Sequence, residues 1–216
     1  MRSARQITLA GMGAIMAMAG FEHGLGEALQ GNVAPGGLVI ESWPHSEFYR
    51  SLAGEPAMTL IPNLLVSGVL TMLLSLALLV WMLRFVGRPD SALIIAALSI
   101  PLLLVGGGFG PPVLGLILAA ATKVNSPSTR WHSKLPRGAR QVLAASWPIL
   151  FASCIMAWLL MLLGLPALGY FSVLESDAVV LGVLVLAFFL LALALFSSFA
   201  RDVESGAIRT DAGLAW

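Results

Sequence analysis

Five long apolar runs take up most of this 216-residue sequence, and they constrain its fold more than any other feature. About 20 apolar residues in a helix cross the hydrocarbon core of a bilayer, and four of the runs have an ordinary length for this. Charged residues make up only 11% of the chain, against about 25% in a soluble domain. The sequence therefore predicts an all-α fold, a polytopic integral membrane helix bundle. The runs comprise residues 7–29, 60–85, 92–122, 142–165 and 177–200.

The third run is too long for one crossing, and it is interrupted. As a single helix its 31 residues would rise about 46 Å, against about 30 Å of hydrocarbon. Residues 106–112 also break it, because three successive glycines followed by Phe-Gly-Pro-Pro disfavour a continuous helix. We therefore expect two short segments, 91–106 and 111–125, that form a hairpin around this Gly/Pro-rich turn. At this point the hairpin could cross the bilayer fully or re-enter the same face.

The distribution of basic residues favours the hairpin. Cytoplasmic segments of membrane proteins carry an excess of Lys and Arg. With the hairpin, 11 of the 12 Lys and Arg lie on the same side as the N-terminus, whereas a single crossing would leave only 4 there. We therefore predict about six hydrophobic segments in the cell membrane, with both termini cytoplasmic, an extracytoplasmic loop over 31–59 and a basic cytoplasmic loop over 123–140.

The chain is expected to form one membrane domain over residues 1–216, because no long Pro/Ser-rich linker divides it. An alternative concerns the N-terminus. The first run ends in Ala17-Met18-Ala19, which fits the A-x-A pattern that precedes signal peptidase cleavage. Cleavage there would release residues 1–19 as a signal peptide and leave the remaining topology unchanged.

Several classes of function are disfavoured by composition and motifs. A net charge of +1 argues against nucleic-acid binding, and the single cysteine, Cys154, allows neither a disulfide framework nor a Cys-based metal site. No haem, flavin, nucleotide or phosphate-loop pattern occurs, and neither does a G-x-S-x-G or H-E-x-x-H motif. No catalytic residue is assigned, and enzyme activity is less expected than its absence. The expected partners are the lipid bilayer and either another copy of the chain or a membrane complex.

The densest polar stretch, residues 20–31, closes the first apolar run. His23 and Glu27 are four residues apart and Gln30 is three further on, so these side chains share one face of a helix, while Glu22 points about 100° away. Ionisable groups at membrane depth are costly and by default indicate function. Such a set could hold a divalent metal, exchange protons or anchor a ligand's head group. Alternatively, the helix ends where this stretch begins, and the polar groups lie in headgroups or water.

Two other features are predicted to lie on the same side of the membrane. The extracytoplasmic loop could act as a lid, and the backbone of the glycine turn could face an ion, as it does in discontinuous transporter helices. Plainer interpretations are an interfacial aromatic belt for the loop and a tight turn for the glycines. The candidate ligand-binding residues are Glu22, His23, Glu27, Gln30, Glu55, Asn63, Gly107 and Phe109, and the candidate metal ligands are His23, Glu27 and His45.

Three functions are compatible with these features. The favoured one is a small transporter or an ion- or solute-binding protein with an outward-facing polar site, because three unusual features converge on one face. The second is a membrane-embedded enzyme that acts on a lipophilic substrate, with His23 and Glu27 as an acid–base pair. The third is a structural or accessory subunit of a membrane complex. The cofactor is unknown, and a divalent metal is a candidate.

Overall fold

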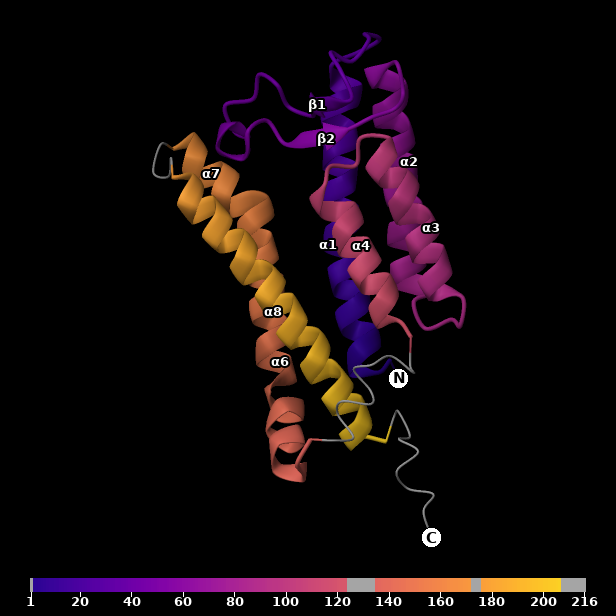
Figure 1. The fold of residues 1–216 in the computed structure, drawn as a ribbon, viewed down its shortest axis with the longest axis vertical. Coiled ribbons are helices and arrows are strands. Elements are labelled where there is room, and N and C mark those ends of the chain that lie inside the picture. The colour runs from indigo at the N-terminus through magenta and orange to yellow at the C-terminus, as the bar shows by residue number, and fades with distance from the viewer. Residues whose placement is uncertain (1, 124–134, 172–175, 207–216) are drawn as a thin grey trace.

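The computed structural model describes residues 2–123, 135–171 and 176–206, and within them the chain is mostly helical (Figure 1). The first group of helices comprises α1 (Ala4–Leu29), α2 (Leu64–Arg84), α3 (Ser91–Leu104) and α4 (Gly110–Ala121). The second group comprises α6 (Arg137–Leu159), the π-helical turn η2 (Leu160–Gly164), α7 (Leu165–Tyr170) and α8 (Asp177–Glu204). Most of the basic loop predicted over 123–140 lies outside the described residues.

Among the described residues, three helices are long and apolar enough to cross a membrane: α2, the continuous α6–η2–α7 helix over Arg137–Tyr170, and α8. The structure is therefore consistent with a membrane protein. α3 and α4 are apolar but shorter, at 14 and 12 residues. α1 has 26 residues, carries the polar stretch, and is not among the three candidate spans.

α1 is one unbroken helix that packs along α2. A Cβ atom on Gly24 would lie 2.7 Å from the carbonyl oxygen of Gly68, and one on Gly68 would lie 2.3 Å from that of Gly24. Glycines at such a contact let two helix backbones approach closely. Because this packing stabilises the helix beyond the intrinsic propensity of its residues, α1 continues to Leu29. The alternative in which the helix ends near Gly20 is wrong.

α3 and α4 pack against each other and against the first two helices. Gly106 and Gly108, in the turn that joins them, have φ angles of 104° and 71°. These left-handed conformations are easily adopted only by glycine. Pro111 and Pro112 lie in the first turn of α4, where the missing backbone N–H groups need no intrahelical partner. The glycines therefore form the turn of a helical hairpin.

The two groups of helices meet at one end of the molecule and diverge towards the other (Figure 1). We call the end where α1 begins and α8 finishes the terminal end, and the opposite end the loop end. At the terminal end, the Asp202 carboxylate of α8 accepts hydrogen bonds from the backbone N–H groups of Ala4 at 2.7 Å and Arg5 at 3.3 Å. The Trp147 indole N–H donates to Thr8 Oγ1 at 2.9 Å. An anion at a helix N-terminus is stabilising, so these contacts join α8 and α6 to α1.

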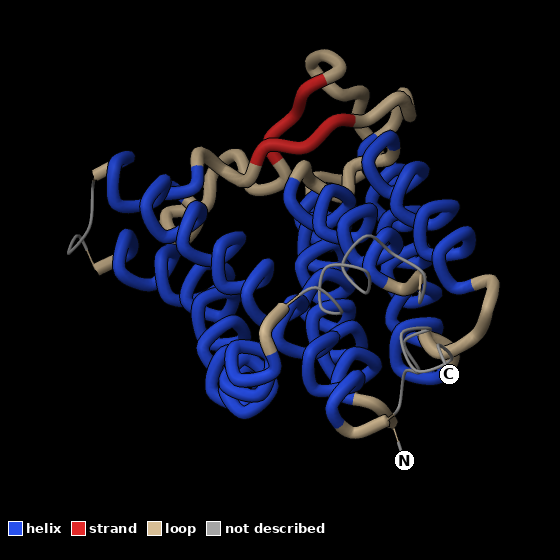
Figure 2. The backbone as a smooth tube through the Cα atoms, turned by 60° about the horizontal axis from the view of Figure 1, so that its bottom comes forward, coloured by secondary structure: helices blue, strands red, loops and turns tan. Residues whose placement is uncertain are grey.

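A small antiparallel sheet covers the loop end (Figure 2). It pairs β1 (Val39–Glu41) with β2 (Pro56–Met58), and these short strands depart from the predicted all-helical fold. Residues 42–55, which we call the bridging loop, join the strands and contain the 3₁₀ turn η1 (Arg50–Leu52). The bridging loop reaches α7, where the Ser51 hydroxyl donates to the carbonyl of Leu165 at 3.3 Å. It therefore connects the two groups where they are farthest apart.

Candidate functional site

A cavity of about 620 Å³ lies between the two groups of helices, under the bridging loop. This is an ordinary size for a small-molecule site. α1, α4, α8 and the α6–η2 segment supply its walls, and the side chains lining it are mostly apolar. They include Ile15, Met16, Ala19, Phe109, Leu114, Trp158, Leu181, Leu184 and Phe188.

His23 and Glu55 form a polar pair in the wall of this cavity. His23 Nε2 lies 3.1 Å from Glu55 Oε2, and His23 Nδ1 lies 3.0 Å from the hydroxyl of Ser42. His23 is 7% exposed and Glu55 is 9% exposed, while Ser42 is fully buried. The imidazole is therefore held on both nitrogens, by two residues of the loop end that lie far from it in sequence.

Glu22 extends this pair to three groups. One ligand atom from each of Glu22, His23 and Glu55 lies within 4.8 Å of the other two. The hydroxyl of Tyr49, on the bridging loop, interacts with the Glu22 carboxylate. The Oε1 atom of Glu22 is buried and has no hydrogen-bond partner among the described residues. We call Glu22, His23 and Glu55 the Glu-His-Glu cluster.

The environment of the cluster favours neutral or cation-bound carboxyl groups. Burial and the neighbouring Glu22 carboxylate raise the pKa of Glu55 above its ordinary value. Burial and the charge of Glu22 also raise the pKa of Tyr49, so its phenol stays protonated and can donate. Two adjacent buried carboxyl groups cannot both ionise cheaply without a compensating positive charge. The cluster can therefore share a proton or bind a cation.

The backbone that presents Glu55 is strained. Ala53, Gly54 and Glu55 have φ angles of 52°, 68° and 54°, which is the left-handed region. Non-glycine residues seldom adopt it, and such strain costs about 1–3 kcal/mol per residue. Backbone hydrogen bonds hold the conformation, from Ser42 N–H to Glu55 O at 3.1 Å and from Trp43 N–H to Gly54 O at 2.9 Å. The loop end thus maintains an unfavourable conformation that directs Glu55 towards His23.

Glu27 lies apart from the cluster, against the glycine turn. It is fully buried, and a Cβ atom on Gly106 would lie 2.0 Å from its Oε1. Neither carboxylate oxygen has a hydrogen-bond partner among the described residues. Ser67 is a neighbour of Glu27, but its hydroxyl donates to the carbonyl of Val105 at 2.7 Å. The sequence grouped Glu27 with His23 in a metal site, whereas the structure places it outside the Glu-His-Glu cluster.

The glycine turn contacts the side chains of both His23 and Glu27. A Cβ atom on Gly108 would lie 2.3 Å from His23 Nε2, which matches the close contact between Gly106 and Glu27. Gly107 donates its backbone N–H to the carbonyl of Leu102 at 2.8 Å, so that amide is already bonded within the hairpin. Phe109, at the end of the turn, is 42% exposed and lines the cavity.

The remaining residues predicted for the site are Gln30, Asn63 and His45, and they lie outside the Glu-His-Glu cluster. The Gln30 amide donates to the carbonyl oxygens of Ser42 at 3.0 Å and Glu41 at 3.1 Å, which fixes the start of the bridging loop. Asn63 caps α2 by accepting from the Val66 N–H at 3.0 Å, and its amide donates to Asn32. His45 is exposed on the bridging loop, outside the Glu-His-Glu cluster.

The sequence did not predict that Ser42 and Tyr49 belong to the candidate site. It also did not predict that α8 forms a wall of the cavity. Ser42 was part of a Ser-Trp-Pro tripeptide with no local pattern that suggests a hydrogen bond to an imidazole. Tyr49 was grouped with the interfacial aromatic residues. The cavity-lining residues of α8 are ordinary apolar residues of a hydrophobic run, and no signal in the sequence distinguishes them from lipid-facing ones.

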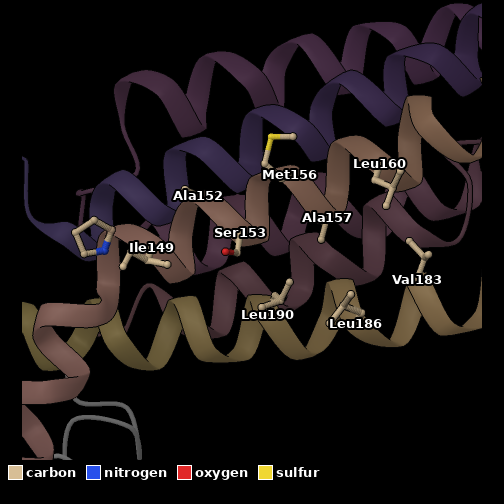
Figure 3. Close-up of a pocket in the computed structure, with 10 residues that line it drawn as sticks. Ile149, Ala152, Ser153, Met156, Ala157, Leu160, Val183, Leu186 and Leu190 are labelled. Carbon is tan, nitrogen blue, oxygen red and sulfur yellow. The ribbon is translucent and has the colours of Figure 1, made fainter.

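A second cavity, of about 730 Å³, is a groove between α6 and α8 (Figure 3). Apolar side chains line it, with Ser153 as the polar exception, and Ile149 and Met156 are 73% and 64% exposed. An exposed apolar surface of this kind is expected where a helix pair faces lipid. The residues that line the groove include no ionisable side chain, unlike those of the first cavity.

No protein-family model, curated protein or solved structure matches this chain.

Proposed function

We propose that this protein binds an amphiphilic, lipid-like molecule in the cavity between α1, α4 and α8. The apolar part of the ligand would lie against α4 and α8, and its polar head group would meet His23 and Glu55. One observation carries the proposal: a mostly apolar cavity of about 620 Å³ has a buried His–Glu pair in its wall. Ligand sites combine an apolar lining with a few convergent polar groups in this way.

The same geometry supports a carrier rather than a passive binding protein. The cavity is lined from the middle of α1 to the bridging loop, whereas contacts of Asp202 and Trp147 with α1 close the terminal end. A site near one end of a helix bundle whose opposite end is closed is what one state of an alternating-access transporter requires. We therefore propose that the transported solute is a lipophilic molecule.

The proposed orientation places the cavity on the extracytoplasmic side. It consists of six hydrophobic segments with both termini cytoplasmic, and it rests on the distribution of basic residues. The path of the chain supports it, since α1 begins and α8 finishes at the same end and the bridging loop lies at the other (Figure 1). With 14 and 12 residues, α3 and α4 rise only about 21 and 18 Å, so a re-entrant hairpin remains an alternative with the same sidedness.

Photocrosslinking with a diazirine-labelled phospholipid in liposomes tests the proposal. Leu184 lines the cavity and Leu186, two residues along α8, lines the groove of Figure 3. Leu184→Trp fills the cavity, and we expect it to reduce crosslinks to Phe109 and Leu181 at least about threefold. Leu186→Trp should leave those crosslinks unchanged, and both variants should retain crosslinks to Ile149 in the groove. Crosslinked peptides are identified by mass spectrometry.

The proposal fails if wild-type protein crosslinks in the groove but not in the cavity. It also fails if Leu184→Trp and Leu186→Trp reduce the cavity crosslinks equally, since a general disturbance of α8 would then explain the loss. Size-exclusion chromatography and thermal unfolding of both variants show whether their folds are intact.

The second candidate function is an enzyme that acts on the head group of the bound molecule. The proximity of two carboxyl groups and an imidazole favours it, because such a set can donate and accept protons. Mass spectrometry of lipid recovered after incubation distinguishes the two functions. A carrier returns the phospholipid unchanged, and an enzyme returns a product that His23→Ala no longer forms.

A further inference from the structure

We propose that Glu22, His23 and Glu55 bind one divalent transition-metal ion of the zinc class. This inference goes beyond the proposed binding of an amphiphile and does not depend on it. It also replaces the metal ligands expected from the sequence, because Glu55 and Glu22 take the places assigned to Glu27 and His45.

The donor atoms and their spacing suit such an ion. Imidazole nitrogen and carboxylate oxygen are ordinary zinc ligands, with bonds of about 2.0–2.2 Å, so two ligands of a tetrahedral ion lie roughly 3.3 Å apart. His23 Nε2 and Glu55 Oε2 are already 3.1 Å apart. The ligand atom of Glu22 completes a set of three whose members lie within 4.8 Å of one another.

The histidine is oriented as a metal ligand should be. Metal-binding histidines usually donate the N–H of one ring nitrogen to a neighbouring group, which fixes the tautomer and leaves the other nitrogen to the metal. His23 Nδ1 lies 3.0 Å from the buried hydroxyl of Ser42. Donation from Nδ1 to Ser42 leaves the lone pair of Nε2 directed at the carboxylate of Glu55. Ser42 is held in turn by its backbone hydrogen bond to Glu55.

An independent observation points to a missing positive charge. Oε1 of Glu22 is buried and has no hydrogen-bond partner among the described residues. Buried charged groups are ordinarily paired or coordinate a metal, because an isolated one loses its hydration without compensation. A cation within the cluster would satisfy this oxygen and the adjacent carboxylate of Glu55 at the same time.

A metal ion held by these three side chains would have one coordination position that no protein atom fills. Zinc sites with three protein ligands keep a fourth position for water or a bound molecule. Because His23 and Glu55 line the cavity, this position would open into it. An oxygen atom of a phosphate or carboxylate head group could occupy it, and this one step rests on the proposed function.

Metal titration of the full-length protein tests the inference. Protein purified in detergent is stripped with EDTA, dialysed and titrated with ZnCl₂ by calorimetry, and with CoCl₂ while visible absorption is recorded. We expect one equivalent of Zn²⁺ and visible Co²⁺ bands of tetrahedral or five-coordinate intensity. His23→Ala, Glu22→Gln and Glu55→Gln should each weaken binding more than about tenfold, and Ser42→Ala should weaken it about tenfold while preserving the bands.

Glu47→Gln is the matched control. Glu47 lies on the same bridging loop, its side chain is 72% exposed, and it pairs with Arg50 rather than with the cluster. It should bind Zn²⁺ as wild type does. The inference is overturned if wild-type protein binds less than stoichiometric Zn²⁺, or if Glu47→Gln loses as much affinity as Glu55→Gln. Because the wild-type stoichiometry is itself decisive, a variant that fails to fold leaves the test intact.

Leu184→Trp separates this inference from the proposed function. The substitution fills the apolar part of the cavity and leaves the cluster untouched, so we expect normal Zn²⁺ binding together with reduced lipid crosslinking. Normal Zn²⁺ binding in a protein that never crosslinks lipid in its cavity would refute only the proposed function. Lipid crosslinking without Zn²⁺ binding would refute only the metal site.

Discussion

At the scale of single residues, His23 and Glu27 of α1 both contact the glycine turn, but their hydrogen-bonding environments differ. His23 has partners on both ring nitrogens, whereas the oxygens of Glu27 have no hydrogen-bond partner among the described residues. An unpaired carboxylate at zero exposure carries a large desolvation cost. The shape of Glu27 therefore contributes to packing against Gly106, whereas a negative charge on its carboxyl group would destabilise the fold.

The first prediction follows from this difference. Glu27→Gln, which keeps the shape and removes the charge, should leave the unfolding temperature unchanged or raise it. Glu27→Ala should lower the free energy of unfolding by about 1–3 kcal/mol, because it leaves a void beside the glycine turn. Thermal unfolding in detergent measures both, with Glu41→Gln on the exposed side of β1 as control. A Glu27→Gln protein that unfolds several degrees below wild type would mean that the carboxylate charge has a favourable partner.

At the scale of elements, the contact between α1 and α2 positions the Glu-His-Glu cluster. Glycines at the crossing bring the two backbones together, and the same crossing places the polar end of α1 beside the turn between α3 and α4. Gly20 and Gly24 have the spacing of small residues at a helix contact. That spacing does not reveal that Gly68 of α2 is the partner, because a small-residue motif does not identify the helix that packs on it.

Gly68→Ala should destabilise the protein by about 1–3 kcal/mol. The added Cβ would lie 2.3 Å from the Gly24 carbonyl oxygen and 2.5 Å from the Ala28 nitrogen, and backbone atoms cannot move aside as side chains do. Gly182→Ala is the matched control, because no atom lies within 4 Å of its Cβ position and alanine is the better helix former. Thermal unfolding should give a lower midpoint for Gly68→Ala and an equal or higher one for Gly182→Ala. Equal midpoints would contradict the close α1–α2 contact.

At the scale of the whole molecule, two groups of helices are joined at the terminal end and held apart at the loop end. Asp202 and Trp147 make the contacts at the terminal end, and the bridging loop spans the gap at the other. The cavity is a consequence of this divergence. Its position relative to the membrane depends on the proposed orientation, which can be measured directly.

Thiol labelling in intact cells tests the orientation. Cys154 is fully buried and is replaced by serine to give a background without cysteine. On this background, His45→Cys on the bridging loop should react with a membrane-impermeant maleimide. Ser133→Cys, which lies outside the described residues, should be protected until the cells are permeabilised. Labelling of Ser133→Cys in intact cells would contradict the six-segment orientation and favour a single crossing by residues 92–122.

The sequence by itself determined the helical character, the apolar lengths typical of a membrane and the hairpin at residues 106–112. These features are local, because the length of a hydrophobic run and the conformational demands of glycine and proline act over a few residues. It also proposed Glu22 and His23 as candidates, since ionisable side chains at the end of an apolar run are costly wherever they occur.

Only the tertiary structure decided which of these residues meet. Glu55 joins Glu22 and His23 across more than thirty residues because the bridging loop holds a strained left-handed backbone at Ala53 and Glu55. Glu27 is separated from His23 because Gly106 and Gly108 each face one of the two side chains. The cavity depends on how far α8 diverges from α1. Such outcomes depend on packing between distant segments, and no periodicity within one segment encodes them.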